Sequence, residues 1–439
     1  MFEKLRNIFQ VPELKRRILF TLALFVVYRL GEHLPSPGVN AKALAGAFES
    51  QRGTLFGLYD LFVGGAFSRA TVFALGIMPY ISSSIILQVL GAVVPYFEKL
   101  RKEGEEGQKK LTQLTRYGTV LISIIQSLGY SVFLVRMSGQ GSAVVPNPNW
   151  LFYVSTIVTQ TTGTIFVMWL GEKITEHGIG NGISLIIFVN ILGGVPNRIF
   201  AAIDSFRAGS LNIFTGLLLL ALMVAVIAAV IVMTQATRKI PVQYAKRIVG
   251  RKMYGGANTH IPLRVNTAGV IPIIFASSLL ILPTTIAGFF PPTSPFAALG
   301  QWFNPLGVLY NVLYALLIIG FTYFYTAVVL NPNDLAESMR KNAGFIPGIR
   351  PGRKTAEYID RVLSRITLPG AIFLALIAVL PDVLIATMKV PFLGFGGTSV
   401  LIVVGVALDT LQQIESHLIM RHYEGLMKRG RIRGRGQRM

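Results

Sequence analysis

Long apolar stretches alternate with polar, charged segments along almost the whole chain. Most of these stretches reach the roughly 20 residues that a helix needs to cross a hydrocarbon core of about 30 Å. There are ten of them, at 18–34, 72–94, 117–136, 151–171, 183–202, 213–234, 268–290, 307–330, 366–388 and 398–420. None has the alternating polarity of barrel strands, and lipid leaves no partner for unpaired backbone groups. We therefore predict an all-α membrane protein with ten transmembrane helices.

Positive charge is sorted by loop. The chain has 41 Lys and Arg against 20 Asp and Glu, a net charge of +21, although 52% of its residues are hydrophobic. Basic residues crowd the N-terminus, the 95–116, 235–265 and 331–365 loops and the tail after 420, whereas 138–150 and 291–306 contain none. An excess of Lys and Arg marks the cytoplasmic side. Both termini and the basic loops are therefore assigned to the cytoplasm, which agrees with an even number of spans.

The ten spans divide into two halves. A short, weakly charged external connection at 201–212 separates residues 1–200 from 213–420, and a basic tail, 421–439, follows. Each half then has five spans, so the second starts from the opposite side of the membrane. Two odd-numbered halves fit an inverted repeat with a functional path at the interface between them.

Three segments interrupt the alternation of helix and loop. Residues 56–70, FGLYDLFVGGAFSRA, are apolar but too short to span, and we expect either an interfacial helix or a short element folded back into the bundle. The 235–265 and 331–365 loops each hold seven Lys or Arg. Charge of this kind orients a membrane protein and attracts anionic lipid. Loops of this length exceed what topology needs, so docking of a partner is an equally good interpretation.

Enzyme and ion-coupling chemistry have little support. Glu32, Glu172 and Asp382 fall at predicted span ends, and Asp409 alone is a credible buried carboxylate, with a structural role favoured. The chain has no Cys, P-loop, HExxH or GxSxG, so we predict no catalytic residue, metal site or cofactor. Isoleucines at helical spacing recur in the spans instead, and by themselves they indicate no more than packing.

Several long motifs resemble bacterial SecY, the central subunit of the protein-conducting channel of the plasma membrane. They are ALGIMPYISSSIILQ (74–88), TRYGT (115–119), GEKITEHGIGNGIS (171–184), YAKRIVGRKMYGGANTHIPLRVNTAGVIPIIFASS (244–278), FIPGIRPGRKT (345–355) and GGTSVLIVVGVALD (396–409). The motifs follow the family's order and extend over nearly the whole chain. The resemblance implies ten spans in two inverted five-helix halves around an hourglass pore with a lateral opening to lipid.

The resemblance also implies roles for individual residues in the pore. The family's pore ring corresponds to Ile77, Ile81, Ile187, Ile191, Ile274 and Ile402. Its plug, which fills the external funnel at rest, corresponds to residues 57–70, here called the plug segment, with Leu58, Phe62, Gly64, Gly65, Phe67 and Arg69. Ser82 and Leu282 fall where the lateral gate opens, although the family often has Phe at the second position.

The cytoplasmic loops correspond to docking surfaces for the ribosome and the SecA motor ATPase. Arg251 and Lys252 match a basic loop tip, and Arg350, in GIRPG, matches a position on which SecA-driven work depends. The resemblance further implies SecE and SecG as small membrane subunits, secretory and membrane preproteins with signal sequences as cargo, and membrane lipids as neighbours. It places the chain in the bacterial inner membrane. The alternative function is an inverted-repeat secondary transporter of a small solute, which would need cavity-facing carboxylates.

Overall fold

The computed structural model describes residues 11–48, 55–138, 144–207, 209, 212–244, 247–249, 252–254, 258–287, 307–388 and 397–429. Each of the ten apolar stretches contains a helix. These ten helices are α2 (Pro12–Gly31), α5 (Met78–Val93), α7 (Glu105–Ser138), α8 (Trp150–His177), α9 (Gly182–Arg207), α10 (Ile213–Gln235), α11 (Ile271–Ala287), α13 (Val308–Val329), α15 (Arg353–Met388) and α16 (Gly397–Arg429). The shorter helices are α3 (Ala41–Phe48), α4 (Leu55–Phe62), α6 (Pro95–Lys102) and α14 (Pro332–Lys341).

Length and apolar composition are sufficient for membrane crossing in several of these helices. Within the described ranges six qualify, namely α7, α8, α10, the α13–α14 segment, α15 and α16, and α5 with α6 makes a seventh if this pair, bent by 98°, is one span. Two shorter apolar helices, Gly182–Pro196 and Ile271–Ile281, lie within α9 and α11. The prediction of a mainly helical protein that crosses the membrane several times is confirmed.

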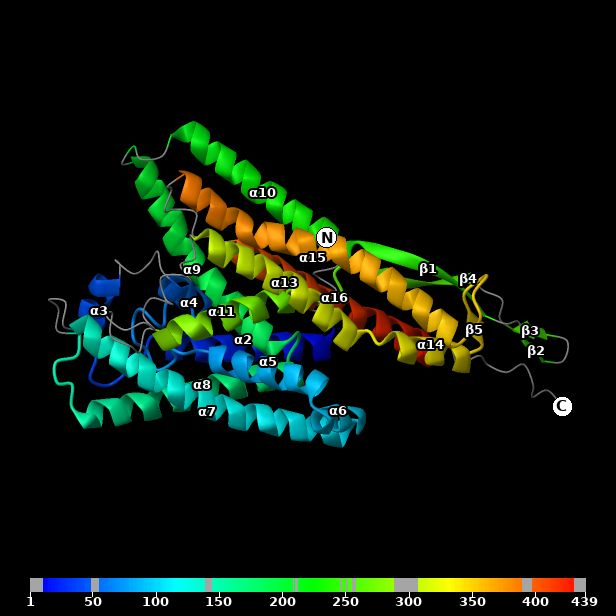
Figure 1. Ribbon diagram of the computed structural model, residues 1–439, viewed down its shortest axis with the longest axis horizontal. Helices are drawn as coiled ribbons and strands as arrows, with labels where there is room; N and C mark the ends of the chain where they lie inside the picture. Colours follow the sequence, from blue (N-terminus) through cyan, green and yellow to red (C-terminus); the bar gives the residue numbers. More distant parts are fainter. Residues whose placement is uncertain are drawn as a thin grey trace.

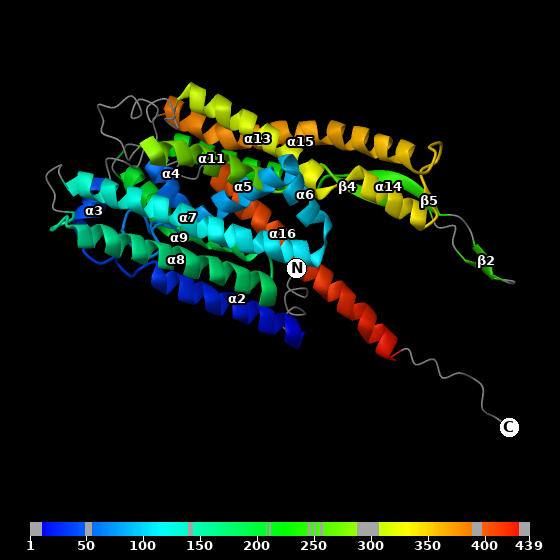
Figure 2. The same cartoon turned by 60° about the horizontal axis from the view of Figure 1, so that its bottom comes forward.

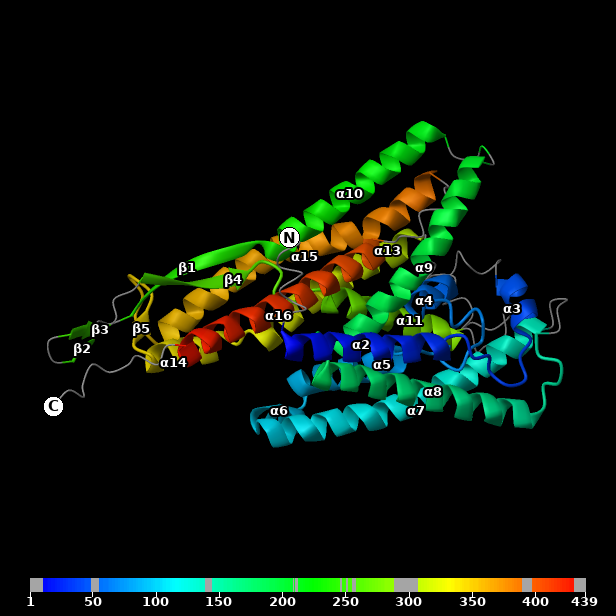
Figure 3. The same ribbon diagram turned by 180° about the vertical axis from the view of Figure 1, so that it is seen from behind.

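The long helices lie side by side, and their connections gather at two ends (Figure 1). One end carries α6, α14, the strands and the C-terminal part of α16, all from regions predicted to be cytoplasmic. The other end carries α3, the C-terminal end of α9 and the start of α10. The view from behind shows the same sorting (Figure 3). The described parts of the three basic loops thus lie at one end of the helix bundle.

The 235–265 loop forms strands, so the all-α prediction was wrong outside the membrane part. In this loop β1 (Thr237–Tyr244) pairs antiparallel with β4 (Asn258–Arg264), and β2 (Arg247–Val249) pairs with β3 (Lys252–Tyr254). The strand β5 (Gly344–Phe345), from the other basic loop, pairs with the end of β1. Ile240 and Val242 are buried while the residues between and before them are exposed. This alternation of period two stabilises a strand that has one buried face.

Three hydrophobic clusters hold the elements together. The largest joins α2–α5 and α7–α9 to α11 and α16, and the second joins α10, α11, α13, α15 and α16. The third packs β1 and β4 against α14 and α15 with Met339, Ile346, Ile359 and Leu363. The largest cluster therefore contains residues of both halves, and it holds the candidate site.

Two prolines lie in the first turns of long helices. Pro79 is in the first turn of α5, which begins at Met78, and Pro272 is in the first turn of α11. A proline there leaves no hydrogen bond unmade, because the first turn has no internal acceptor for its N–H. Other prolines lie inside helices, among them Pro196 in α9 and Pro283 in α11.

Candidate functional site

All six isoleucines predicted for the pore ring are buried in the largest hydrophobic cluster. They come from four helices. Ile77 and Ile81 lie at the start of α5, Ile187 and Ile191 on α9, Ile274 on α11 and Ile402 on α16. Residues four apart share a helix face, so each helix presents its isoleucines in one direction. Ile183, one turn before Ile187, also packs against this cluster, and the sequence analysis missed it although it has the same spacing.

The plug segment lies against these isoleucines. It consists of α4 and a series of turns up to Ala70, and its Phe62, Val63, Ala66 and Phe67 belong to the same cluster. Helix α4 contacts α9 and α11 (Figure 2). Of the two structures expected for residues 56–70, the element folded back into the bundle is therefore present. The side chain of Leu58 lies outside the described residues.

Two glycines let the segment turn sharply. Gly64 and Gly65 have φ values of +69° and +82°, in the left-handed region that side chains disfavour. A Cβ at Gly64 would lie 2.8 Å from Glu32 Oε1 and 3.3 Å from the Cα of Asn190. Gly64 is therefore needed both for its conformation and for close approach to α9.

Hydrogen bonds fasten the turn internally. Arg69 donates from Nε to the Gly65 carbonyl (2.8 Å) and from Nη2 to the Gly64 carbonyl (3.0 Å). The Ser68 amide donates to Asp60 Oδ1 (2.8 Å). Three of the residues predicted for the plug thus form one compact unit, since Arg69 satisfies the carbonyls of both glycines.

Aromatic side chains surround Phe67. Its ring centroid is 4.6 Å from that of Tyr130 and 5.0 Å from that of Tyr59, and Phe48 and Phe133 lie farther out. The Tyr130 hydroxyl also donates to the Phe67 carbonyl (2.7 Å). Tilted aromatic pairs at these separations are attractive beyond their buried area. Phe67 is thus the most heavily packed aromatic of the plug segment.

The sequence predicted Glu32 at the end of a span, close to headgroups and water, but the structure buries it. It is fully buried (0% exposed) and forms an ion pair with Arg29 of α2. The Arg29 guanidinium lies across α9 at Gly193, where any Cβ would overlap it. A buried charge is tolerated only when it is paired and hydrogen-bonded. The pair is therefore part of the packing between α2, α9 and Gly64.

Serines lie on both helices of the predicted lateral gate, α5 and α11. Ser82 is buried, and Ser83 Oγ donates to the Thr115 carbonyl (2.8 Å). Ser277 and Ser278 of α11 are also buried. Small side chains let membrane helices approach closely. Leu282 lies in α11, but its side chain is outside the described residues.

Two of the three predicted docking residues, Arg350 and Lys252, lie at the end of the molecule that carries the strands. Arg350 is exposed, and its carbonyl accepts a hydrogen bond from Thr355 Oγ1 (2.9 Å). Lys354 is hydrogen-bonded to Glu357 (3.1 Å) nearby, and it lowers the pKa of that carboxyl. Lys252 lies in β3, but its side chain is outside the described residues, and so is the whole of Arg251.

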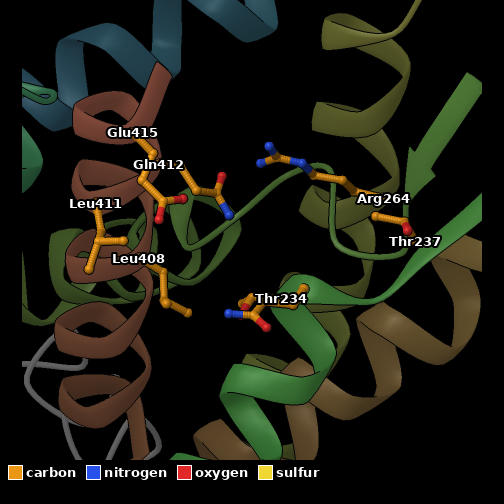
Figure 4. A pocket seen from close by; sticks show the side chains of 8 residues that line it. Thr234, Thr237, Arg264, Leu408, Leu411, Gln412 and Glu415 are labelled. Atoms are coloured by element: carbon orange, nitrogen blue, oxygen red, sulfur yellow. The ribbon is translucent and has the colours of Figure 1, made fainter. Parts of the chain in front are cut away.

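A pocket of about 360 Å³ lies at this end between α10, α16 and the base of the β1–β4 pair. Arg264 faces it from the strand side, whereas Gln412 and Glu415 face it from α16 (Figure 4). Asp409, one helical turn from Gln412, is exposed and has Arg264 as its charged neighbour. This finding corrects the expectation that Asp409 is buried. The pocket's lining residues are distinct from those of the isoleucine cluster.

The candidate site is a buried apolar cluster. The buried centre is made of aliphatic and aromatic groups from both halves, and the described residues hold no group of three or more His, Asp or Glu placed to bind a metal ion. The fold matches that of a structure described as a protein-conducting channel, with a TM-score of 0.66 and 17% identity over 92% of this chain and 93% of that one. It also matches canine Sec61 in a ribosome–channel complex, with a TM-score of 0.63 and 17% identity over 92% and 93%.

Sequence comparison identifies the family. A family model described as SecY matches residues 71–411. The protein translocase subunit SecY of Escherichia coli K12 is 46% identical over 428 residues, which cover 97% of this chain and 96% of the relative. The chain belongs to the SecY family. It is a subunit of a protein-conducting translocation channel, and it is not an enzyme.

Proposed function

We propose that the ten long helices form two inverted five-helix halves, residues 1–200 and 213–420, around an hourglass pore. The two-ended sorting of charged loops and the burial of isoleucines from both halves in one cluster support this arrangement. By the same charge rule, both termini and the strands face the cytoplasm of a bacterial cell. The chain is then a multi-pass protein of the inner membrane.

The six isoleucines act as an apolar gasket. A channel for unfolded polypeptide must pass any side chain and still block ions at rest. Polar groups would bind the moving chain and offer ions a hydrated path, whereas an apolar constriction closes by dewetting. Ile side chains are stiff at χ1, so they close around chains of different widths without collapsing. Hydrophobic contact is non-directional and holds no single sequence.

The plug segment, 57–70, seals the external side at rest. Its Phe62, Val63 and Ala66 lie in the same cluster as the ring residues. The sharp turn at Gly64 and Gly65 folds the segment into a compact unit. The packing of the plug segment in the same cluster as the six isoleucines, with α4 against α9 and α11, is the observation that carries the proposal.

Hydrophobic segments leave sideways between α5 and α11, beside Ser82 and Leu282. No catalytic group is needed for this step, because partitioning is sufficient. A Leu at the membrane centre contributes about −0.6 kcal/mol and a Lys, Arg or Asp costs roughly 2.5–3.5 kcal/mol. Ten leucines are worth about −6 kcal/mol on that scale, which two charges nearly cancel. A segment that samples lipid through the gate is thus sorted by its own composition.

The work of translocation comes from partners. Arg350, Arg251 and Lys252 form a basic docking region for the SecA motor and for the ribosome, whose RNA is attracted by positive charge. One of the solved structures with this fold is a ribosome–channel complex. SecE and SecG complete the membrane assembly, signal-bearing preproteins are the cargo, and lipids surround it. The secondary-transporter alternative lacks support, because its best candidate carboxylate, Asp409, lies outside the isoleucine cluster.

Resting ion leak tests this function. Replacing Ile187, Ile274 and Ile402 together with Ser should raise the ion permeability of vesicles that contain the purified channel. Ile318→Ser is the matched control, because Ile318 is equally buried but belongs to the second cluster. Permeability that stays at the resting value in the triple variant would overturn the gasket. A leak of equal size in the control would show general damage instead.

A further inference from the structure

Asn190 is a buried amide in the middle of an apolar cluster. It is 1% exposed and comes directly before Ile191 on α9. Burying an amide without hydrogen bonds costs free energy, so a buried Asn requires partners. Its Nδ2 donates to two of them, the Phe62 carbonyl at 2.9 Å and the Tyr28 hydroxyl at 2.9 Å. One partner belongs to the plug segment and the other to α2.

The Phe62 carbonyl is the last in α4. The final carbonyls of a helix find no N–H donor within the helix, so they need a donor from outside it. Helix α4 has eight residues, too few to be stable in isolation. Asn190 therefore fixes the end of the plug helix from a different span, just before the Gly64–Gly65 turn that rests against the α9 backbone.

The hydrogen bonds named for the plug segment all reach the first half. Besides Asn190, the Tyr59 hydroxyl donates to the Leu75 carbonyl (3.0 Å), the Tyr130 hydroxyl to the Phe67 carbonyl (2.7 Å), and the Ser36 amide to the Ala70 carbonyl (2.8 Å). From the second half, Ile274 and Ile402 join the same cluster as apolar side chains. These directional bonds attach the segment to the first half, and apolar side chains of the second half pack in the same cluster.

We propose that Asn190, supported by Tyr28, is a positioning residue that holds the plug segment on the first half and sets how readily it is displaced. The inference rests on the plug role proposed above. Parting of the two halves breaks the apolar seal without breaking these hydrogen bonds. Displacement of the plug requires, in addition, the loss of the bond between Asn190 and the Phe62 carbonyl, while the bond to Tyr28 holds the amide in place. Opening therefore has two stages with separate energetic requirements.

A single cysteine reports on the second stage. The chain has no native Cys, and Val63 is 1% exposed. Val63→Cys should resist a membrane-impermeant maleimide at rest and react when an arrested preprotein occupies the channel. Adding Asn190→Leu, which keeps the side-chain size but removes the donors, should speed resting labelling roughly tenfold or more, because the buried Phe62 carbonyl of the plug segment is left without its donor. Resting ion leak should rise in parallel.

Two further variants keep the result interpretable. Tyr28→Phe removes one bond only and should speed labelling by a smaller factor, about threefold to tenfold, so it replaces Asn190→Leu if that variant does not fold. Thr322→Val is the control, because Thr322 is buried in α13 and its hydroxyl donates to the Ile318 carbonyl of its own helix. It should leave labelling unchanged.

The possible failures are distinguishable. Labelling that rises with an arrested preprotein but not with Asn190→Leu or Tyr28→Phe overturns the role of Asn190 and leaves the plug in place. Labelling that an arrested preprotein does not change overturns the plug function as well. Equal acceleration by Thr322→Val overturns the specific role of Asn190, since any buried polar loss would then release the segment.

Discussion

Gly193 is the position where α9 makes room for a charged side chain. The Arg29 guanidinium crosses the helix there to pair with the buried Glu32, and a Cβ would occupy the same space. Gly193→Ala therefore forces Arg29 away. The variant leaves Glu32, which is 0% exposed, without its ion-pair partner.

The cost follows from burial. Removing one partner of a buried ion pair destabilises a protein by about 3–5 kcal/mol. The Arg29 side chain is 31% exposed and Arg69 is a second positive neighbour of Glu32, so we take the lower end of that range. Replacing a helical Gly by Ala stabilises the helix by about 1 kcal/mol. The net loss is then about 2 kcal/mol, or roughly thirtyfold in the unfolding equilibrium constant.

A double-mutant cycle isolates this effect. The free energy of unfolding of the purified channel in mixed micelles is measured for Gly193→Ala, Glu32→Gln and the double variant. In the Glu32→Gln background there is no buried carboxylate for the displaced Arg29 to leave unpaired, so Gly193→Ala should cost less than about 1 kcal/mol and the two changes should couple by about 2 kcal/mol. Gly320→Ala is the control, because a Cβ there meets nothing within 4 Å.

The reasoning is refuted if Gly193→Ala is as stable as Gly320→Ala. Additive effects of Gly193→Ala and Glu32→Gln would refute it equally, because they would mean that a side chain at position 193 does not disturb the ion pair between Arg29 and Glu32.

Four other variants test the packing and the proposed site. Phe67→Ala should destabilise the resting channel by about 3–5 kcal/mol and raise ion leak, because its aromatic neighbours lose a buried ring. Glu172→Gln should change the unfolding free energy by less than about 1 kcal/mol, since its Arg116 partner is exposed. Cysteines at Ser82 and Leu282 should form a disulfide in the idle channel and block entry of signal sequences. Arg350→Glu should impair ATP-driven export of preproteins by SecA while the purified channel keeps its thermal stability.

Each expectation has a contrary outcome. A stable, tight Phe67→Ala channel would remove Phe67 from the seal. A large loss with Glu172→Gln would mean that the surface pair is structural. Absence of the disulfide would place the gate elsewhere, and normal export with Arg350→Glu would reduce Arg350 to a charge that only orients the chain.

Hydropathy predicted the helices well, because lipid constrains their length and composition directly. The same reasoning placed Glu32 close to headgroups and water, since it lies at the end of its apolar stretch. Its burial is produced by Gly64, Asn190 and Gly193, which are distant in sequence. No local pattern contains that information.

The strands were missed for a different reason. Alternating polarity in a membrane protein suggests barrel strands, whereas Ile240 and Val242 alternate with exposed residues in a basic loop. No role was predicted for Asn190, because the role of one amide among isoleucines depends on which groups accept its hydrogen bonds.

The pairing of β1 with β5 has a mechanical consequence. Gln243 and Tyr244 of one basic loop are bonded to Phe345 and Gly344 of the other, and Ile359 of α15 packs beneath them. A force applied to either loop is therefore transmitted to the other through this strand pair. Helix α15 has 36 residues, about 54 Å at 1.5 Å per residue, so a rotation of about 5° at the sheet would move its far end by about 5 Å. Two partners that pull on these loops would therefore both move α15 through the same sheet.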